Sequence, residues 1–232
     1  MLKIAIPKKG RLSNPCLDIL KRSGYEFEDS GRKLFSLIEE KNIEAVFVRT
    51  QDIPEYVQDQ VVDIGITGLD IIMERKAEVE ILQKMGFGKC TLTVAAPKNS
   101  SIKSFQDIKD GIKIVTEFPN VTDNFFKNKG ISLKVIEVSG STEIAPYLGV
   151  SDLISDIVST GTTLVMNNLK PISKIIESEA VLIANKDSLK EKSEEIELLS
   201  SSIRSVLVAQ GKKYIMVNLP TKSLALFEKE FH

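Results

Sequence analysis

Short apolar runs alternate with amphipathic segments along most of this 232-residue chain. Residues 3–7 and 44–50 have the composition of buried strands, whereas residues 14–24 and 69–76 have the apolar spacing of amphipathic helices. This alternation favours an α/β protein with a largely parallel sheet. A charged stretch at residues 187–210 predicts one long amphipathic helix near the C-terminus.

The alternation restarts near Pro97, directly after the apolar run CTLTVAAP, and a further strand-like run begins at residue 181. We therefore expect two α/β domains. The first is discontinuous and comprises residues 1–96 plus 181–232, and the second, residues 97–180, is inserted into it. Because ligands commonly bind where two domains meet, we expect the functional site in the interdomain cleft.

Charge and composition exclude several classes of protein. The chain has 31 basic and 32 acidic residues, so no overall positive field recruits nucleic acid. It has no apolar run of membrane-spanning length, and Met1 leads directly into the strand-like KIAIP without a signal peptide, so we expect a soluble, cytoplasmic protein. The only histidine, His232, is the last residue, which excludes a Ser-His-Asp triad or a His-ligated metal site unless the chain terminus supplies the ring.

A Ser-Thr-Gly-Thr-Thr turn follows the apolar run that contains Asp156. Gly161 frees the backbone of this turn to approach an anion, and a helix that starts near Leu164 would point its positive end at the same place. The turn has no lysine, unlike a Walker A loop, and therefore predicts a site for a phosphate monoester. Asp156 can accept hydrogen bonds from sugar hydroxyls, so phosphate and diol together indicate a ribose 5-phosphate. The alternative is a strand-end acid beside an ordinary turn. The loop's hydroxyl donors are Ser159, Thr160, Thr162 and Thr163.

Other polar residues lie where predicted strands end. Lys9 and Arg11 follow the first strand, at the edge where open α/β sheets bind ligands. Arg32 offers a planar fork for phosphate oxygens, and Arg49 ends another strand. Asp70 opens a predicted helix and is either an acceptor for a base or sugar or a helix cap. Each of the basic residues is alternatively a plain surface charge.

Seven segments of the chain, taken together, resemble the ATP phosphoribosyltransferase family and occur in that family's order. They are AIPKKGRL, GRKL, VRTQDIPEYV, VDIGITGLD, GFGKCTLTVAAP, GSTEIAPYLG and SDLISDIVSTGTTL. The resemblance extends from about residue 3 to residue 186. It implies a two-domain fold like that of type II periplasmic binding proteins. It also implies attack of N1 of ATP on C1 of phosphoribosyl pyrophosphate, which opens histidine biosynthesis.

Matching positions carry the family's site residues onto this sequence. Asp156 and the 159–163 loop would hold the ribose hydroxyls and the 5-phosphate, and Glu143 would be a second acceptor for the diol. Arg11 and Arg32 would be the catalytic residues, engaging ATP and stabilising the departing pyrophosphate. The ATP-binding residues would be Lys9, Arg11, Arg49 and Asp70. Displacement of pyrophosphate requires alignment and stabilisation of an anion rather than a strong nucleophile, which suits these residue types.

The resemblance also carries expectations about cofactor and partners. Mg²⁺ would arrive bound to the substrate, without a metal site made by the protein. The protein would be a homo-oligomer that binds neither nucleic acid nor membrane. The chain resembles short forms that lack a C-terminal histidine-binding domain and depend on a regulatory subunit similar to histidyl-tRNA synthetase; a natural short form and a shortened chain both fit. The alternative function is a non-catalytic nucleotide- or solute-binding protein of the same fold.

Overall fold

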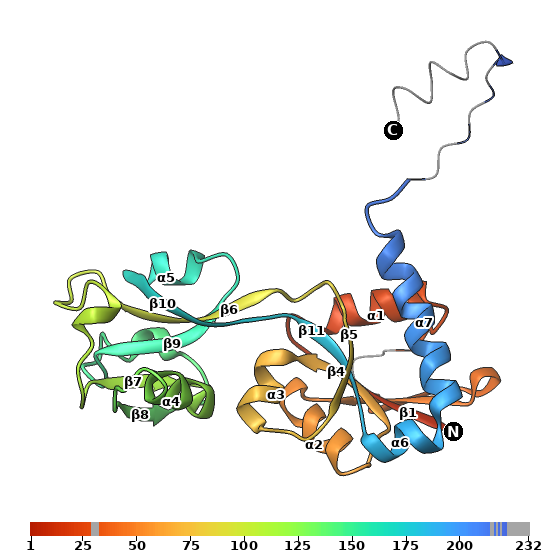
Figure 1. The fold of residues 1–232 in the computed structure, drawn as a ribbon, viewed down its shortest axis with the longest axis horizontal. Helices are drawn as coiled ribbons and strands as arrows, with labels where there is room; N and C mark the ends of the chain where they lie inside the picture. Colours follow the sequence, from red (N-terminus) through yellow and green to blue (C-terminus); the bar gives the residue numbers. More distant parts are fainter. Residues whose placement is uncertain (29–32, 214–215, 217, 219, 222–232) are drawn as a thin grey trace.

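The computed structural model describes residues 1–28, 33–213, 216, 218 and 220–221. It has two α/β lobes side by side, with helix α7 on the outer side of the lobe that holds the N-terminus (Figure 1). One sheet has six strands in the order β2-β3-β1-β4-β11-β5, and the other has five in the order β10-β6-β9-β7-β8. A mixed α/β fold of two domains is confirmed.

The bounds of the elements are as follows. The strands are β1 (Leu2–Pro7), β2 (Phe35–Ile38), β3 (Ile43–Val48), β4 (Ile64–Gly68), β5 (Glu80–Lys84), β6 (Cys90–Pro97), β7 (Lys113–Thr116), β8 (Lys134–Glu137), β9 (Leu153–Val158), β10 (Leu169–Ser178) and β11 (Ala180–Ala184). The α-helices are α1 (Ser13–Arg22), α2 (Ile53–Gln58), α3 (Leu69–Arg75), α4 (Pro119–Lys127), α5 (Thr162–Met166), α6 (Lys186–Glu191) and α7 (Ser193–Ala209). Short 3₁₀ helices are η1 (Glu39–Lys41), η2 (Thr50–Asp52), η3 (Phe105–Asp107) and η4 (Thr142–Ile144).

Alternating side chains of the central strands divide each domain into two cores, because successive strand residues point to opposite faces. In β1, Ile4 and Ile6 pack with residues of α1 and α7, whereas Ala5 packs with residues of α2 and α3. In β6, Val94 shares a core with residues of α4, whereas Ala95 shares one with α5. Each sheet is therefore covered by helices on both faces.

The sheets are mixed rather than largely parallel, which corrects the prediction. Strand β1 pairs in parallel with β3 and β4, and β7 pairs in parallel with β8 and β9. The pairings of β11 with β4 and β5, of β6 with β9 and β10, and of β2 with β3 are antiparallel. The reason is that β6, β10 and β11 adjoin the crossings between the domains, so the chain leaves and returns in opposite directions through neighbouring strands (Figure 1).

The first crossing lies earlier in the chain than the predicted boundary at residue 97. Strand β6 is hydrogen-bonded to β9 and β10 in the second sheet, so the chain crosses between Lys84 and Cys90. The apolar run of β6 resembles the strands of the first domain, and nothing in its composition shows which sheet it joins. The chain returns between Ser178 and Ala180.

The predicted helix at residues 187–210 is divided at Lys192, whose φ of −131° is not helical. The break brings the Lys192 ammonium to the buried Asp63 carboxylate, with both oxygens at 2.8 Å. Ser188 and the backbone N–H of Lys3 also donate to Asp63. Burial alone would raise the pKa of Asp63, but these hydrogen bonds and the Lys192 charge lower it below its ordinary value.

The helices of the described residues include none with the length and apolar character needed to span a membrane.

Candidate functional site

The predicted phosphate loop lies between β9 and α5, at the carboxyl end of β9. Gly161 has a φ of +79°, a conformation that favours glycine, and a Cβ there would meet no atom within 4 Å. Backbone conformation rather than space therefore selects glycine. Helix α5 starts at Thr162, two residues before the predicted Leu164, so the N-terminal amide groups lie within the loop. The hydroxyls of Thr160 and Thr162 are 3.0 Å apart.

The hydroxyl side chains of the loop are exposed, and part of the loop borders a cavity of about 390 Å³. Ser159, Thr160 and Gly161 line this cavity, and Thr91 and Lys174 face it from β6 and β10. Lys174 was missed by the sequence analysis because β10 was not predicted. Lys174 is the one cationic side chain among the residues that line this cavity, and its ammonium lies 3.2 Å from Glu177 on the surface.

Asp156 lies in β9, three residues before the loop begins. One carboxylate oxygen accepts a hydrogen bond from the Thr142 hydroxyl at 2.6 Å, and the other accepts one from the backbone N–H of Ile157 at 2.7 Å. Burial raises the pKa of Asp156, the two hydrogen bonds oppose that rise, and the negative charge of Glu143 adds to it. The carboxylate is thus held in place by neutral donors.

Two further carboxylates approach Asp156. Glu143 lies in the short helix η4 and lines a separate cavity of about 540 Å³ that extends to Asn167. Glu117 follows β7, and burial together with the charges of Asp156 and Glu143 raises its pKa. Glu117 is not among the predicted site residues, because a single glutamate between a strand and a proline has no distinctive sequence pattern.

Arg11 and Asp70 form the first domain's side of the site. Asp70 is 1% exposed, lies 3.6 Å from Arg11, and accepts a hydrogen bond from the Ser178 hydroxyl at 2.5 Å. The Arg11 guanidinium also donates to the Gly88 carbonyl at 2.5 Å and to the Cys90 sulfur at 3.1 Å. Gly88 has a φ of +66° and lies against Leu12, so both its conformation and its surroundings require glycine. Asp70 therefore contacts Arg11 and Ser178, which link it to the crossing segments. The predicted role of Asp70 was that of an acceptor for a base or sugar, or of a helix cap.

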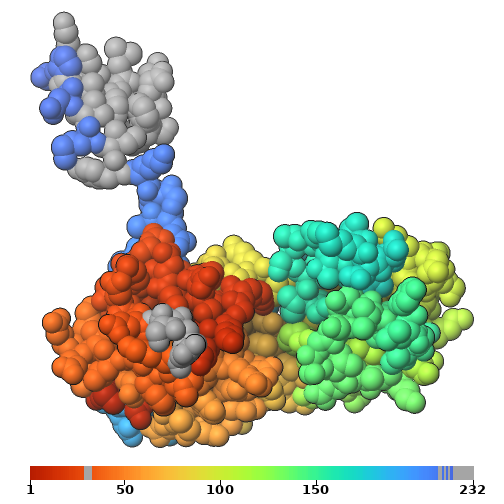
Figure 2. Space-filling view, turned by 180° about the vertical axis from the view of Figure 1, so that it is seen from behind, coloured from red at the N-terminus to blue at the C-terminus, as the bar shows by residue number. Residues whose placement is uncertain are grey.

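Residues of both domains line a cavity of about 300 Å³, where Arg11, Asp70, Glu117 and Asp156 meet. The first domain contributes Arg11 and Asp70, and the second contributes Glu117, Phe118 and Asp156. Figure 2 shows the two lobes meeting along a furrow in the molecular surface. Cationic and anionic groups thus face the same space from opposite domains.

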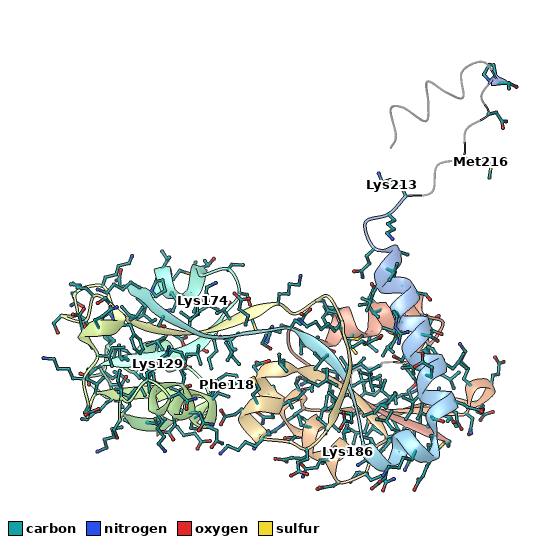
Figure 3. All side chains as sticks on the ribbon, viewed as in Figure 1. Phe118, Lys129, Lys174, Lys186, Lys213 and Met216 are labelled. Atoms are coloured by element: carbon teal, nitrogen blue, oxygen red, sulfur yellow. The ribbon has the colours of Figure 1, made fainter. Side chains whose placement is uncertain are left out.

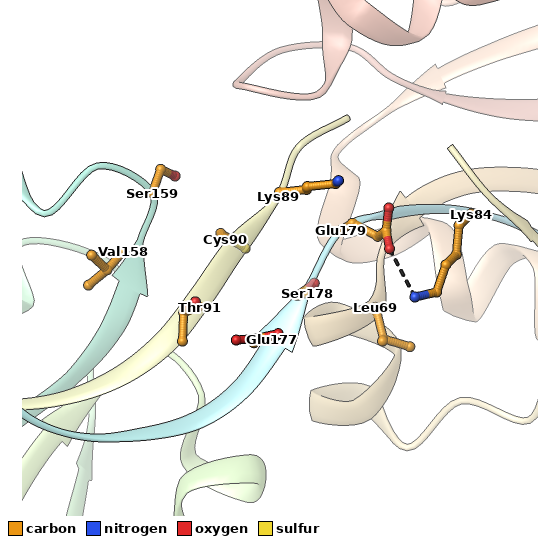
Figure 4. Close-up of a pocket in the computed structure, with 10 residues that line it drawn as sticks. All are labelled: Leu69, Lys84, Lys89, Cys90, Thr91, Val158, Ser159, Glu177, Ser178 and Glu179. Carbon is orange, nitrogen blue, oxygen red and sulfur yellow. Dashed lines mark ion pairs between the residues drawn. The ribbon is translucent and has the colours of Figure 1, made fainter. Parts of the chain in front are cut away.

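A further cavity of about 380 Å³ lies beside the crossing strands (Figure 4). Ser159 of the loop lines it, as do Lys84, Lys89 and Glu179. Lys84 forms a 3.0 Å ion pair with Glu179. The loop is therefore accessible from more than one side.

The remaining predicted residues are more peripheral. Lys9 is exposed after β1, and Arg49 is exposed immediately before η2; neither lines the 300 Å³ cavity. Arg32 lies outside the described residues. Among the described residues, no three His, Cys, Asp or Glu side chains are arranged to hold a metal ion.

Comparison with known proteins identifies the sequence's relatives. The family described as "HisG: ATP phosphoribosyltransferase" matches residues 49–205. Proteins named ATP phosphoribosyltransferase from Methanococcus maripaludis and Methanocaldococcus jannaschii are each 47% identical over 224 residues, which cover 95% of this chain and 78% of theirs.

Solved structures agree with the sequence comparison. A chain of the "ATP phosphoribosyl transferase (HisG:HisZ) complex" from Thermotoga maritima superposes with a TM-score of 0.80 at 32% identity, covering 91% of this chain and 100% of that one. A substrate-binding protein of an amino acid ABC transporter superposes with a TM-score of 0.59 at 14% identity, covering 90% of this chain and 93% of that one. The latter similarity shows the fold alone, and it confirms the expected likeness to periplasmic binding proteins.

Proposed function

This chain belongs to the ATP phosphoribosyltransferase family, and we propose that its interdomain cleft is where it performs that family's reaction. The reaction is the first step of histidine biosynthesis. N1 of ATP attacks C1 of phosphoribosyl pyrophosphate, the bond from C1 to the pyrophosphate oxygen breaks, and phosphoribosyl-ATP and pyrophosphate form. The observation that carries the proposal is the cavity that Arg11 and Asp156 line from opposite domains.

The second domain binds the phosphoribosyl group in this proposal. The amides and hydroxyls of residues 159–163 donate to the 5-phosphate, assisted by the positive end of α5 and by the Lys174 charge. Asp156 accepts hydrogen bonds from the ribose hydroxyls, and Glu143 is a second acceptor. The Thr142 hydroxyl and the Ile157 amide fix the Asp156 carboxylate before substrate arrives, which reduces the entropy lost on binding.

The first domain stabilises the leaving group. Negative charge builds on pyrophosphate as its bond to C1 breaks, and a guanidinium held by Asp70 and the Gly88 carbonyl is pre-oriented to meet it. Arg11 is therefore the catalytic residue of the described chain, and Arg32 is assigned the same role from the family resemblance. Lys9 and Arg49 contribute positive charge to ATP binding from outside the cavity, and Asp70 acts through Arg11.

Mg²⁺ is carried by phosphoribosyl pyrophosphate in this proposal and neutralises part of the pyrophosphate charge. Oxygen atoms such as those of a diphosphate are the ligands that Mg²⁺ prefers.

We further propose a homo-oligomer that works in the cytoplasm with a regulatory subunit. The support for a partner is the Thermotoga maritima relative, whose structure is described as a HisG:HisZ complex.

The test is product formation. The chain is incubated with ATP, phosphoribosyl pyrophosphate and Mg²⁺, with inorganic pyrophosphatase to draw the reaction forward, in the presence and absence of the regulatory subunit. We expect phosphoribosyl-ATP. If both substrates bind and no product forms under either condition, the chain is the non-catalytic binding protein that the shared fold also allows. Product from another purine base in place of ATP would change the acceptor and retain the phosphoribosyl site.

A further inference from the structure

Helix α4 of the second domain begins without a cap of its own. Pro119 occupies its first turn, and Phe118 at the N-cap position offers no side-chain acceptor. The backbone N–H groups of Asn120 and Val121 therefore need acceptors from elsewhere.

The acceptor is a carboxylate from the other domain. Glu74 of α3 accepts the Asn120 N–H on one oxygen and the Val121 N–H on the other, each at 3.0 Å. The Asn120 side-chain amide donates in return to the Glu74 carbonyl at 3.1 Å. Glu74 is 9% exposed, and the positive end of α4 favours an anion at this point.

An apolar contact accompanies these hydrogen bonds. Ile71 lies three residues before Glu74, on the same side of α3, and packs against the cluster that contains Leu92, Phe118 and Val121. Figure 3 places Phe118 where the two lobes meet. One side of α3 thus carries both an apolar and a charged contact to the second domain.

These contacts adjoin the cleft at two points. Asp70, which holds Arg11, is in the first turn of α3, and Glu117 and Phe118, which line the cavity, directly precede α4. The position of α4 relative to α3 therefore sets how far the walls of the cavity stand apart.

We propose that Glu74 is a positioning residue that latches the two domains in the arrangement that binds substrates bridging the cleft. The inference rests on the proposed function for the identity of those substrates. If the domains separate, the Glu74 carboxylate and the two amides bond to water instead of to each other, so the latch favours the observed arrangement without making it permanent. A ligand that contacts both domains then binds more weakly when the latch is removed, because the competent arrangement is less populated.

The first experiment compares two ligands by calorimetry in wild type and Glu74→Gln. Phosphoribosyl pyrophosphate spans both domains in the proposed site, whereas ribose 5-phosphate contacts only the second. We expect affinity for the pyrophosphate to fall about fivefold to tenfold by population arithmetic, with affinity for ribose 5-phosphate unchanged. Equal weakening of both ligands would make Glu74 a support of the second domain alone, and no weakening would remove the latch.

The matched control is Glu55→Gln, which removes a carboxylate paired with Arg75 at 3.6 Å entirely within the first domain. We expect it to leave both affinities unchanged.

A second measurement does not depend on the reaction. Spin labels on Lys129→Cys and Lys186→Cys, exposed positions in different lobes, report the distance between the domains (Figure 3). We expect Glu74→Gln to broaden this distance distribution or lengthen it, and Glu55→Gln to leave it unchanged. An unaltered distribution in Glu74→Gln refutes the latch even in a protein that makes product, whereas a failed product assay with an altered distribution refutes only the function.

Discussion

The two domains hold their acidic residues in opposite ways. In the first domain, Asp63 and Asp70 are almost fully buried, and each lies beside a cation, Lys192 or Arg11. In the second domain, Asp156 is held by a hydroxyl and an amide, and its nearest charged neighbours are acidic. No ion pair of Asp156 or Glu117 with a cationic side chain occurs among the described residues.

The difference separates structural carboxylates from those available to a ligand. A buried carboxylate that faces a cation has used its strongest interaction, and removing it leaves that cation unpaired. Burial raises the pKa of Asp156 and of Glu117, and neighbouring carboxylates add to the rise, so each is ionised at a cost. Ligand hydroxyls would relieve that cost. The following predictions test this contrast, from the largest expected effect to the smallest.

Asp63→Ala should damage the fold and spare binding. Alanine leaves the Lys192 ammonium, the Ser188 hydroxyl and the Lys3 amide without their shared acceptor. We expect the free energy of unfolding in urea to fall by about 3 kcal/mol, the scale of breaking a buried charge pair. The dissociation constant for phosphoribosyl pyrophosphate should remain at its wild-type value in the folded fraction.

The matched control is Asp59→Ala, an exposed aspartate of the same domain, which should change stability by less than about 0.5 kcal/mol. Equal effects of Asp63→Ala and Asp59→Ala would mean that the Lys192 pair contributes nothing to stability.

Asp156→Asn should weaken ligand binding and spare the fold. The amide keeps the size of the side chain but loses the charge that strengthens hydrogen bonds from ribose hydroxyls. We expect calorimetry to show phosphoribosyl pyrophosphate binding weakened about 30-fold, or about 2 kcal/mol, with ATP binding nearly unchanged. Stability should not fall, because a carboxylate whose pKa burial raises has been removed.

Asp152→Asn is the control at the other end of the same strand, where Asp152 is exposed and accepts the Lys113 amide. It should leave both affinities intact. A loss of ATP and phosphoribosyl pyrophosphate affinity of equal size in Asp156→Asn would classify Asp156 with Asp63, as a structural residue.

Local sequence patterns predicted the strands and turns that are determined by neighbouring residues. The apolar run at residues 90–97 is strand β6 with those bounds, and the Ser-Thr-Gly-Thr-Thr turn joins a strand to a helix as expected. Strand β10 was missed because LKPISKIIES has no clean alternation, contains a proline and forms its ladder with register shifts. The break at Lys192 was missed because its cause, Asp63, is 129 residues away in the chain.

The sequence predicts candidate site residues by their type, whereas their arrangement comes from the structure. Asp156 and the loop have a sequence pattern of their own, and the structure places them together. Glu117 and Glu74 have none: their settings arise from contacts with Asp156 and with α4, which only tertiary packing creates. The role of Asp70 in the site stays a prediction, and its contacts with Arg11 and Ser178 depend on two distant segments meeting at the crossing.

Arg11→Lys tests whether the cation of the first domain acts on the reaction. Lysine keeps the charge but loses the planar fork that reaches Asp70 and the Gly88 carbonyl together. We expect the single-turnover rate to fall about tenfold, or about 1.4 kcal/mol of transition-state stabilisation, with dissociation constants changing much less. Rapid-quench measurement is required because product release can conceal a slower chemical step.

Arg22→Lys, on the adjacent helix α1 and paired with Asp18 on the surface, should leave the rate unchanged. An unchanged chemical rate in Arg11→Lys would assign leaving-group stabilisation to Mg²⁺ or to another residue.

The smallest effect concerns the pH dependence of stability. The pKa of Glu117 is raised in the folded protein, so between the ordinary carboxyl pKa and that raised value the native state binds more protons than the unfolded state. The contribution of Glu117 to stability is therefore present at acid pH and is lost as pH rises through this window. In Glu117→Gln this loss should disappear. Urea unfolding from acid to neutral pH should therefore show the free energy of unfolding of the variant, relative to wild type, rise through this window and then stay constant.

Glu28→Gln is a control of opposite sign, because hydrogen bonding to Lys33 lowers the pKa of Glu28. This variant should be less stable than wild type at neutral pH, and the difference should vanish as pH falls. Parallel pH curves for Glu117→Gln and wild type would show that the acidic side of the cleft carries no strain for a ligand to relieve.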